Sequence, residues 1–170
     1  MARLRAKFDR PVMENALRSM YVEEQVGVLL GTGWNPVGAD WAGCDFESAS
    51  DVRLEVKQSA ATQSWSQGQP TRGQFDIRPR MGRYDGATWI DDAGRYAHVY
   101  VFAWHGGWGE GVDQRDESQW AYFVVPSTSL PSHQKTIALS SLQKLAIPTD
   151  SAHLRAVVGD VADHILVSQP

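Results

Sequence analysis

The sequence contains little cysteine and no long apolar run. Cys44 is the single cysteine among 170 residues, which excludes an internal disulfide and a zinc site built from several cysteines. No apolar run approaches the roughly 18 residues that a membrane-spanning helix needs. The basic segment 1–7 is not followed by an apolar stretch, so we expect no signal peptide. These absences favour a reducing compartment, and we expect a cytoplasmic location with no membrane partner.

Several common catalytic patterns are also missing. The sequence contains no Gly-Lys-Ser or Gly-Lys-Thr, which excludes a P-loop. The five histidines do not form the closely spaced pairs of zinc hydrolases. Ser127 and Ser129 lack the flanking glycines of a nucleophile elbow, which argues against a serine hydrolase. All of these candidates are weaker than the carboxylate and lysine pattern described below.

The overall composition is that of an ordinary globular domain. Hydrophobic residues make up 42% of the chain and charged residues 21%, which excludes a chain that is disordered throughout. No repeat or internal linker divides the sequence, so we expect one domain over residues 1–170. The net charge of −4 does not favour nonspecific binding to nucleic acid.

Positive charge is nevertheless concentrated between residues 66 and 83. This segment has one acidic residue and four arginines, which are Arg72, Arg78, Arg80 and Arg83. A solvated loop is the usual interpretation of such a segment. The alternative is that these arginines contact the phosphates of a nucleic acid.

Hydrophobic periodicity predicts an α/β protein. Residues 12–30 have apolar positions at helical spacing, including Met20 and Val26, and Gly31 marks the helix end. Residues 96–104 are apolar enough for a central strand buried on both faces. We also expect strands over 34–37, 44–47, 52–58, 74–77 and 120–125, a loop over 78–94, a short helix over 140–145 and a last helix capped by Ser151.

The strand over residues 52–58 carries the pattern with most chemical content. Its alternation places Glu55 and Lys57 on one face and Leu54 and Val56 on the other. A turn between neighbouring strands could bring Asp45 beside Glu55. Two carboxylates can hold a hard cation such as Mg²⁺, which activates water, and a lysine can offset charge in the transition state. The alternative is an ordinary exposed pair of charges on a strand.

The spacing Asp-x9-Glu-x-Lys, after a helix that bears a glutamate, resembles the PD-(D/E)XK nuclease superfamily. The motif covers residues 23 to about 63, and further segments are similar to small bacterial members of that superfamily. The resemblance implies an α/β, restriction endonuclease-like three-layer sandwich, with a mixed central sheet flanked by helices. The proline that names the motif is absent, because Cys44 precedes Asp45.

The resemblance also implies roles for individual residues. Asp45 and Glu55 would ligate Mg²⁺ or Mn²⁺, together with the main-chain carbonyl of Val56. Lys57 would orient the attacking water. The implied activity is Mg²⁺-dependent hydrolysis of phosphodiester bonds, with DNA favoured over RNA as the substrate.

The helix carboxylate of this pattern is either Glu23 or Glu24. In related helices apolar or small residues follow the glutamate at three, four and seven positions; both candidates meet this pattern, and Glu23, which is followed by Val26, Gly27 and Leu30, is preferred. Gln58 or Gln63 could help to orient substrate, although a glutamine that satisfies the sheet or the surface is the more ordinary interpretation.

Two alternatives to a nuclease remain at this point. One is a catalytically silent nucleic-acid-binding or interaction module on the same fold. The other is an ordinary α/β protein in which Glu55 and Lys57 form a surface pair. A nuclease domain of this size often needs a second copy to cut both strands, so a homodimer is a candidate partner, while the sequence leaves the oligomeric state open.

Overall fold

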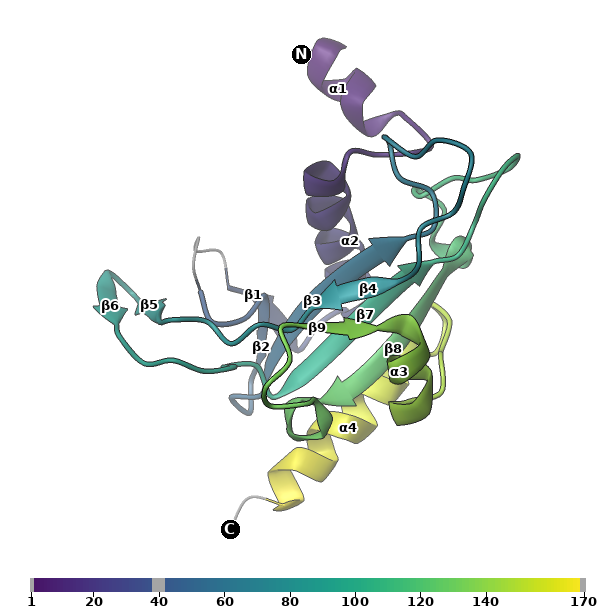
Figure 1. Cartoon of the computed structure of the whole chain (residues 1–170). Coiled ribbons are helices and arrows are strands. Elements are labelled where there is room, and N and C mark those ends of the chain that lie inside the picture. Colours follow the sequence, from purple (N-terminus) through teal and green to yellow (C-terminus); the bar gives the residue numbers. More distant parts are fainter. Residues whose placement is uncertain (1, 38–41, 169–170) are drawn as a thin grey trace.

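The computed structural model describes residues 2–37 and 42–168. Its helices are α1 (Ala2–Phe8), α2 (Asn15–Leu30), α3 (Leu139–Leu145) and α4 (Leu154–Ser168). Its strands are β1 (Trp34–Pro36), β2 (Phe46–Ser48), β3 (Arg53–Ala60), β4 (Gln74–Asp76), β5 (Arg83–Asp85), β6 (Thr88–Ile90), β7 (Val99–His105), β8 (Trp120–Pro126) and β9 (Thr136–Ala138). Figure 1 labels these elements in chain order.

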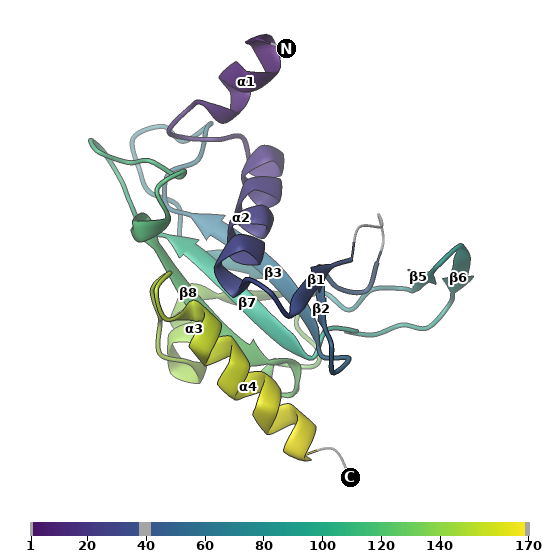
Figure 2. The same ribbon diagram turned by 180° about the vertical axis from the view of Figure 1, so that it is seen from behind.

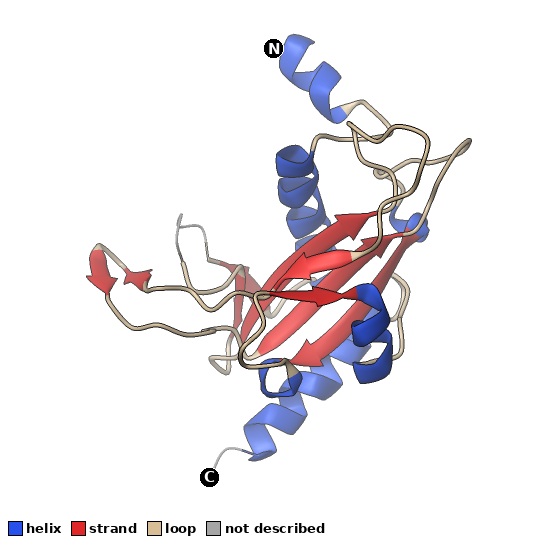
Figure 3. Ribbon diagram, viewed as in Figure 1, coloured by secondary structure: helices blue, strands red, loops and turns tan. Residues whose placement is uncertain are grey.

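The central sheet has five strands in the order β1-β2-β3-β7-β8. Strands β3 and β7 are parallel and the other neighbours are antiparallel, so the sheet is mixed. Helices α2 and α4 cover one face (Figure 2), and α3 with the small β4–β9 sheet covers the other (Figure 3). The predicted fold class is therefore confirmed: α/β, with a mixed central sheet flanked by helices.

The alternation of side chains along the strands separates two cores. Leu54 and Val56 of β3 pack with Val22 of α2 and its neighbours on the helical face. Tyr100 and Phe102 of β7 belong to the second core, with residues of β4 and α3. Burying each of these large apolar side chains contributes roughly 1.5–3 kcal/mol. As predicted, β7 is buried on both faces and forms the centre of the domain.

The buried face of α2 differs from the predicted one. Arg18, Val22, Val26 and Leu30 are buried at a spacing of four residues, whereas Met20 is 60% exposed. A polar residue thus completes the buried stripe, because its side chain forms hydrogen bonds there. A side chain at Gly27 would come within 2.9 Å of the Phe46 ring, so this glycine lets α2 approach β2 closely.

Residues 78–94, predicted as a loop, contain a β-hairpin. Strands β5 and β6 pair around a two-residue turn in which Gly86 has a φ of 58°, a conformation that favours glycine. Tyr84 and Trp89 pack edge to face across the hairpin, 5.2 Å between ring centroids. The hairpin projects from the body as an arm (Figure 1). The prediction was wrong because the strands are short and the flanking residues are turn formers.

Smaller differences concern element ends. Strand β9 and helix α1 were not predicted, and β2 begins two residues later than expected, so Cys44 and Asp45 lie just before it. The turn before α4 is held by Asp150, which accepts from the backbone N–H of His153, and not by Ser151. Among the described residues, no helix combines the length and apolar composition that crossing a bilayer requires.

Candidate active site

The candidate site lies where β2 stops pairing with β3. The last residue of β3 that pairs with β2 is Leu54, opposite Phe46, and Asp45 lies along the next part of the β3 edge. The backbone N–H of Asp45 donates to the Leu54 carbonyl at 2.9 Å, and its Oδ2 accepts from the Val56 N–H at 2.6 Å. The Asp45 carboxylate is thereby fixed against the same strand that carries Glu55.

Glu55 is a buried carboxylate with unequal oxygens. Its side chain is 4% exposed, and its Oε1 forms ion pairs with the Lys57 ammonium and with Arg80 Nη2, the latter at 2.9 Å. Its Oε2 is buried and has no hydrogen-bond partner among the described residues. One oxygen is thus shared by two cations, while the other is enclosed without a hydrogen-bond donor from the described residues.

The acidic groups influence one another. Burial, followed by the negative charge of Glu55, raises the pKa of Asp45 to about 7, although the hydrogen bond from Val56 opposes the rise. Burial also raises the pKa of Glu23, with smaller contributions from Glu24 and Glu55. Carboxylates that raise each other's pKa share one electrostatic environment. Asp45 and Glu23 are therefore both within electrostatic reach of Glu55, and their assignment to one site stays a prediction.

The two glutamates of α2 lie in different surroundings. Glu23 is half-buried and feels the charges of Glu55 and Lys57, whereas Glu24 is exposed. Adjacent residues of a helix differ by about 100° around its axis, so only one of them can face the sheet. The geometry favours Glu23 for any role of this helix in the site.

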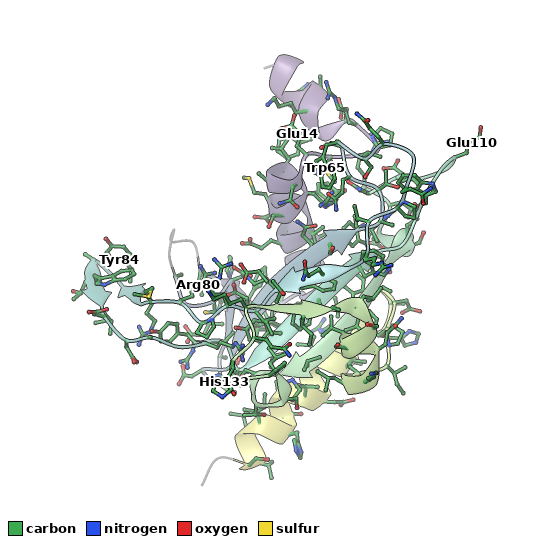
Figure 4. The ribbon with its side chains drawn as sticks, viewed as in Figure 1. Glu14, Trp65, Arg80, Tyr84, Glu110 and His133 are labelled. Atoms are coloured by element: carbon green, nitrogen blue, oxygen red, sulfur yellow. The ribbon has the colours of Figure 1, made fainter. Side chains whose placement is uncertain are left out.

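A hollow of about 260 Å³ opens in front of Glu55 and Lys57. Arg80 enters it at the base of the hairpin arm (Figure 4), and Trp89 of β6 also lines it. Burial lowers the pKa of Arg80, but the charge and hydrogen bond of Glu55 outweigh burial and raise it overall. Burial and the charge of Glu55 raise the pKa of Tyr100, which keeps this phenol neutral.

The four arginines of the basic segment do not act as one group. Arg80 binds Glu55, and the guanidinium of Arg83 lies 5.0 Å from the centre of the Tyr96 ring. Arg78 is exposed beside the hollow, whereas Arg72 is exposed elsewhere. Arg80 and Arg83 thus already have contacts within the protein, whereas Arg78 and Arg72 are exposed, and contact of any of the four with phosphate stays a prediction.

The two candidate glutamines bind another side chain. Gln58 Oε1 accepts from Arg18 Nε at 2.6 Å, and Gln63 Oε1 accepts from Arg18 Nη2 at 2.8 Å. Their amide oxygens are therefore engaged within the protein, in agreement with the more ordinary of the two interpretations. Sequence reasoning did not single out Arg18. The available signal was its four-residue spacing from Val22 and Val26, which places an arginine in an apolar stripe.

The donor atoms at the edge of β3 suit a hard divalent cation. They are the Asp45 carboxylate, the unpartnered Oε2 of Glu55 and the carbonyl of Val56, which shares the strand edge of its N–H. Within the described ranges, no group of three or more His, Cys, Asp or Glu side chains could hold a metal ion. A cation here would rely on two carboxylates, one carbonyl and water, which is the usual environment of Mg²⁺.

Comparison with known proteins gives one structural similarity. No family model matches the chain, and neither does any curated protein. The structure is similar to that of a bacterial homing endonuclease, I-Ssp6803I, with a TM-score of 0.46 and 15% sequence identity. The similarity covers 92% of this chain and 98% of the other. It carries no information about the chemistry of the site, which rests on the contacts described above.

Proposed function

We propose that the protein is a Mg²⁺-dependent nuclease of the PD-(D/E)XK type, which hydrolyses phosphodiester bonds of DNA in preference to RNA. The observation that supports this most strongly is the environment of Glu55. A buried carboxylate with one free oxygen lies beside a second carboxylate and two cationic side chains. Cations and carboxylates at such close range suit a reaction in which a phosphate must be bound and attacked.

In this proposal Asp45, Glu55 and the Val56 carbonyl would hold the cation. A bound Mg²⁺ would supply a water of lowered pKa and a polarised phosphoryl oxygen. The ammonium of Lys57 would orient that water and offset the negative charge that develops in the transition state. Arg80 would contact a nonbridging phosphate oxygen, because its guanidinium already lies in the hollow next to Glu55.

The raised pKa of Asp45 gives the proposed site a pH dependence. Metal ligands must be deprotonated, so binding of a cation would release the proton that Asp45 holds below a pH of about 7. Metal affinity and cleavage should therefore rise between about pH 6 and pH 8.

A catalytically silent nucleic-acid-binding module is the second candidate. The observation that favours it is that Lys57 and Arg80 already neutralise Glu55. If these ion pairs persist when nucleic acid binds, the cluster would hold the fold together and attract phosphate without turnover.

Cleavage assays separate the two candidates. Plasmid DNA, single-stranded DNA and RNA are incubated with the protein in Mg²⁺, in Mn²⁺ and in EDTA. The nuclease proposal predicts cleavage that requires the metal, is fastest on DNA and disappears in Lys57→Ala. Binding of DNA without cleavage in either metal would support the silent module and overturn the nuclease.

A further inference from the structure

Arg18 is a buried cation that forms no ion pair with any described carboxylate. It is 1% exposed, and its hydrogen bonds go to the side-chain oxygens of Asn15, Gln58 and Gln63. Its Nη1 is buried and has no partner in the described part of the chain. Burial lowers the pKa of Arg18 to about 10. A charge buried without a counter-charge is costly, and a bound anion would compensate it.

Arg18 lines a hollow that adjoins the candidate active site. This second hollow has a volume of about 470 Å³ and is bordered by Gln58 and Gln63. Lys57 and Asp76 line both this hollow and the smaller one in front of Glu55. The two hollows therefore meet at Lys57, so a molecule that fills both would extend along the edge of β3.

An exposed aromatic side chain also lines the second hollow. Trp65 is 68% exposed, and it shares this hollow with residues of the first turns of α2 (Figure 4). A solvent-exposed indole next to a cationic group is a typical platform for one unpaired nucleobase. A base inside a duplex cannot stack in this way unless it leaves the helix.

We propose that this hollow is a subsite for one nucleotide of a single strand, with its phosphate on Arg18 and its base stacked on Trp65. The subsite holds the strand so that a neighbouring phosphate lies at Lys57. The subsite rests on the proposed function in one respect, because only that function makes Lys57 part of a catalytic centre. The substrate class that follows is single-stranded or locally unpaired nucleic acid.

Access to Arg18 depends on Gln58. The amide nitrogen of Gln58 donates to Asn15 Oδ1 on the exposed side of the cluster, at 3.0 Å. In the proposed complex this side chain swings outward, and a phosphate oxygen takes the place of its amide oxygen at Arg18 Nε. A guanidinium binds phosphate through two parallel hydrogen bonds, which a lysine cannot reproduce.

Binding measurements without catalysis test the subsite. Fluorescently labelled single-stranded and duplex oligodeoxynucleotides are titrated with protein in EDTA. Trp65→Ala and Arg18→Lys should each weaken single-strand binding about tenfold, while duplex binding changes less than twofold. Trp108→Ala, which removes an exposed tryptophan outside both hollows, should leave both affinities unchanged.

Two further comparisons complete the test. Oligonucleotides with a 5′-phosphate or a 5′-hydroxyl distinguish a terminal from an internal phosphate, and inorganic pyrophosphate should raise the Tm of wild type more than that of Arg18→Lys. Wild-type single-strand affinity in both Trp65→Ala and Arg18→Lys would overturn the subsite. If these variants lose affinity and wild type cleaves nothing, the subsite stands and the nuclease fails. If cleavage depends on Lys57 but the Trp65→Ala and Arg18→Lys variants bind single strands as wild type does, the nuclease stands and the subsite fails.

Discussion

Two buried charges of opposite sign lie on either side of Lys57, and the fold treats them differently. Glu55 is compensated within the protein, because Lys57 and Arg80 both contact its Oε1. Arg18 has neutral amide partners and no ion pair with any described carboxylate. The charge of Glu55, on what we call the acidic side, is therefore compensated until a metal cation competes with Lys57 and Arg80 for it. The charge of Arg18, on the basic side, has no compensating anion among the described residues. The two regions should respond to opposite kinds of ligand.

The largest expected effect is on the acidic side. Lys57→Ala should reduce metal-dependent cleavage by about 10²–10⁴, because the ammonium acts on the attacking water and the transition state. Binding of Mn²⁺ should remain, since Lys57 is not a ligand. Single-turnover cleavage rates measure the change, with the exposed Lys144→Ala as the control. Cleavage at the wild-type rate would remove Lys57 from the mechanism.

The next effect concerns stability without metal. Burial and the charge of Glu55 raise the pKa of Asp45 to about 7. The stability that the protonated Asp45 side chain contributes is therefore fully present below the ordinary pKa of aspartate, and it is lost as the pH rises through 7. Asp45→Asn avoids this loss and keeps an oxygen for the Val56 N–H. We expect the variant to gain on the order of 1–3 kcal/mol at pH 8.

The pH profile of this gain decides its cause. Thermal melts in EDTA between pH 4 and pH 8 should show the Tm advantage of Asp45→Asn shrinking toward zero at the acidic end. An advantage that does not change with pH would contradict an ionised, buried Asp45, and so would a variant less stable than wild type at pH 8.

A smaller effect separates the two glutamates of α2. Glu23→Gln should slow cleavage by at least about tenfold, which corresponds to about 1.4 kcal/mol of transition-state stabilisation. Glu24→Gln should change little, because Glu24 is exposed. Paired rate measurements at saturating Mg²⁺ decide between them. The reverse order would move the role to Glu24, and two small effects would mean that this helix supplies no carboxylate.

The smallest effect belongs to the outer arginines. If Arg72 and Arg78 contact duplex phosphates, their joint replacement by glutamine should lower the slope of log K against log salt concentration by about 0.9 for each lost contact. Arg80 is excluded from this variant because it binds Glu55. An unchanged slope would assign both arginines to solvent.

The sequence predicted the acidic side of the comparison because its geometry is local. Strand alternation alone places Glu55 and Lys57 on one face, and a turn between adjacent strands returns Asp45 to the same edge. The apolar run of β7 likewise identified the centre of the sheet. The roles of these residues in metal binding and catalysis stay predictions.

The basic side could not be predicted because it depends on distant contacts. Arg18 joins Gln58 and Gln63 across 40 and 45 residues of sequence. Arg80 reaches Glu55 from a segment that the sequence marks only as a loop. Neither contact follows from periodicity, which reports the face on which a residue lies and not its partner across the fold.

Calorimetric titration of Mn²⁺ tests the central claim, that the edge of β3 beside Asp45 and Glu55 is a metal site. We expect binding by wild type at pH 8, weaker binding at pH 6 with proton release, no binding by Asp45→Ala and unchanged binding by Glu24→Gln. Absence of binding by wild type, or equal binding by wild type and Asp45→Ala, would contradict the claim.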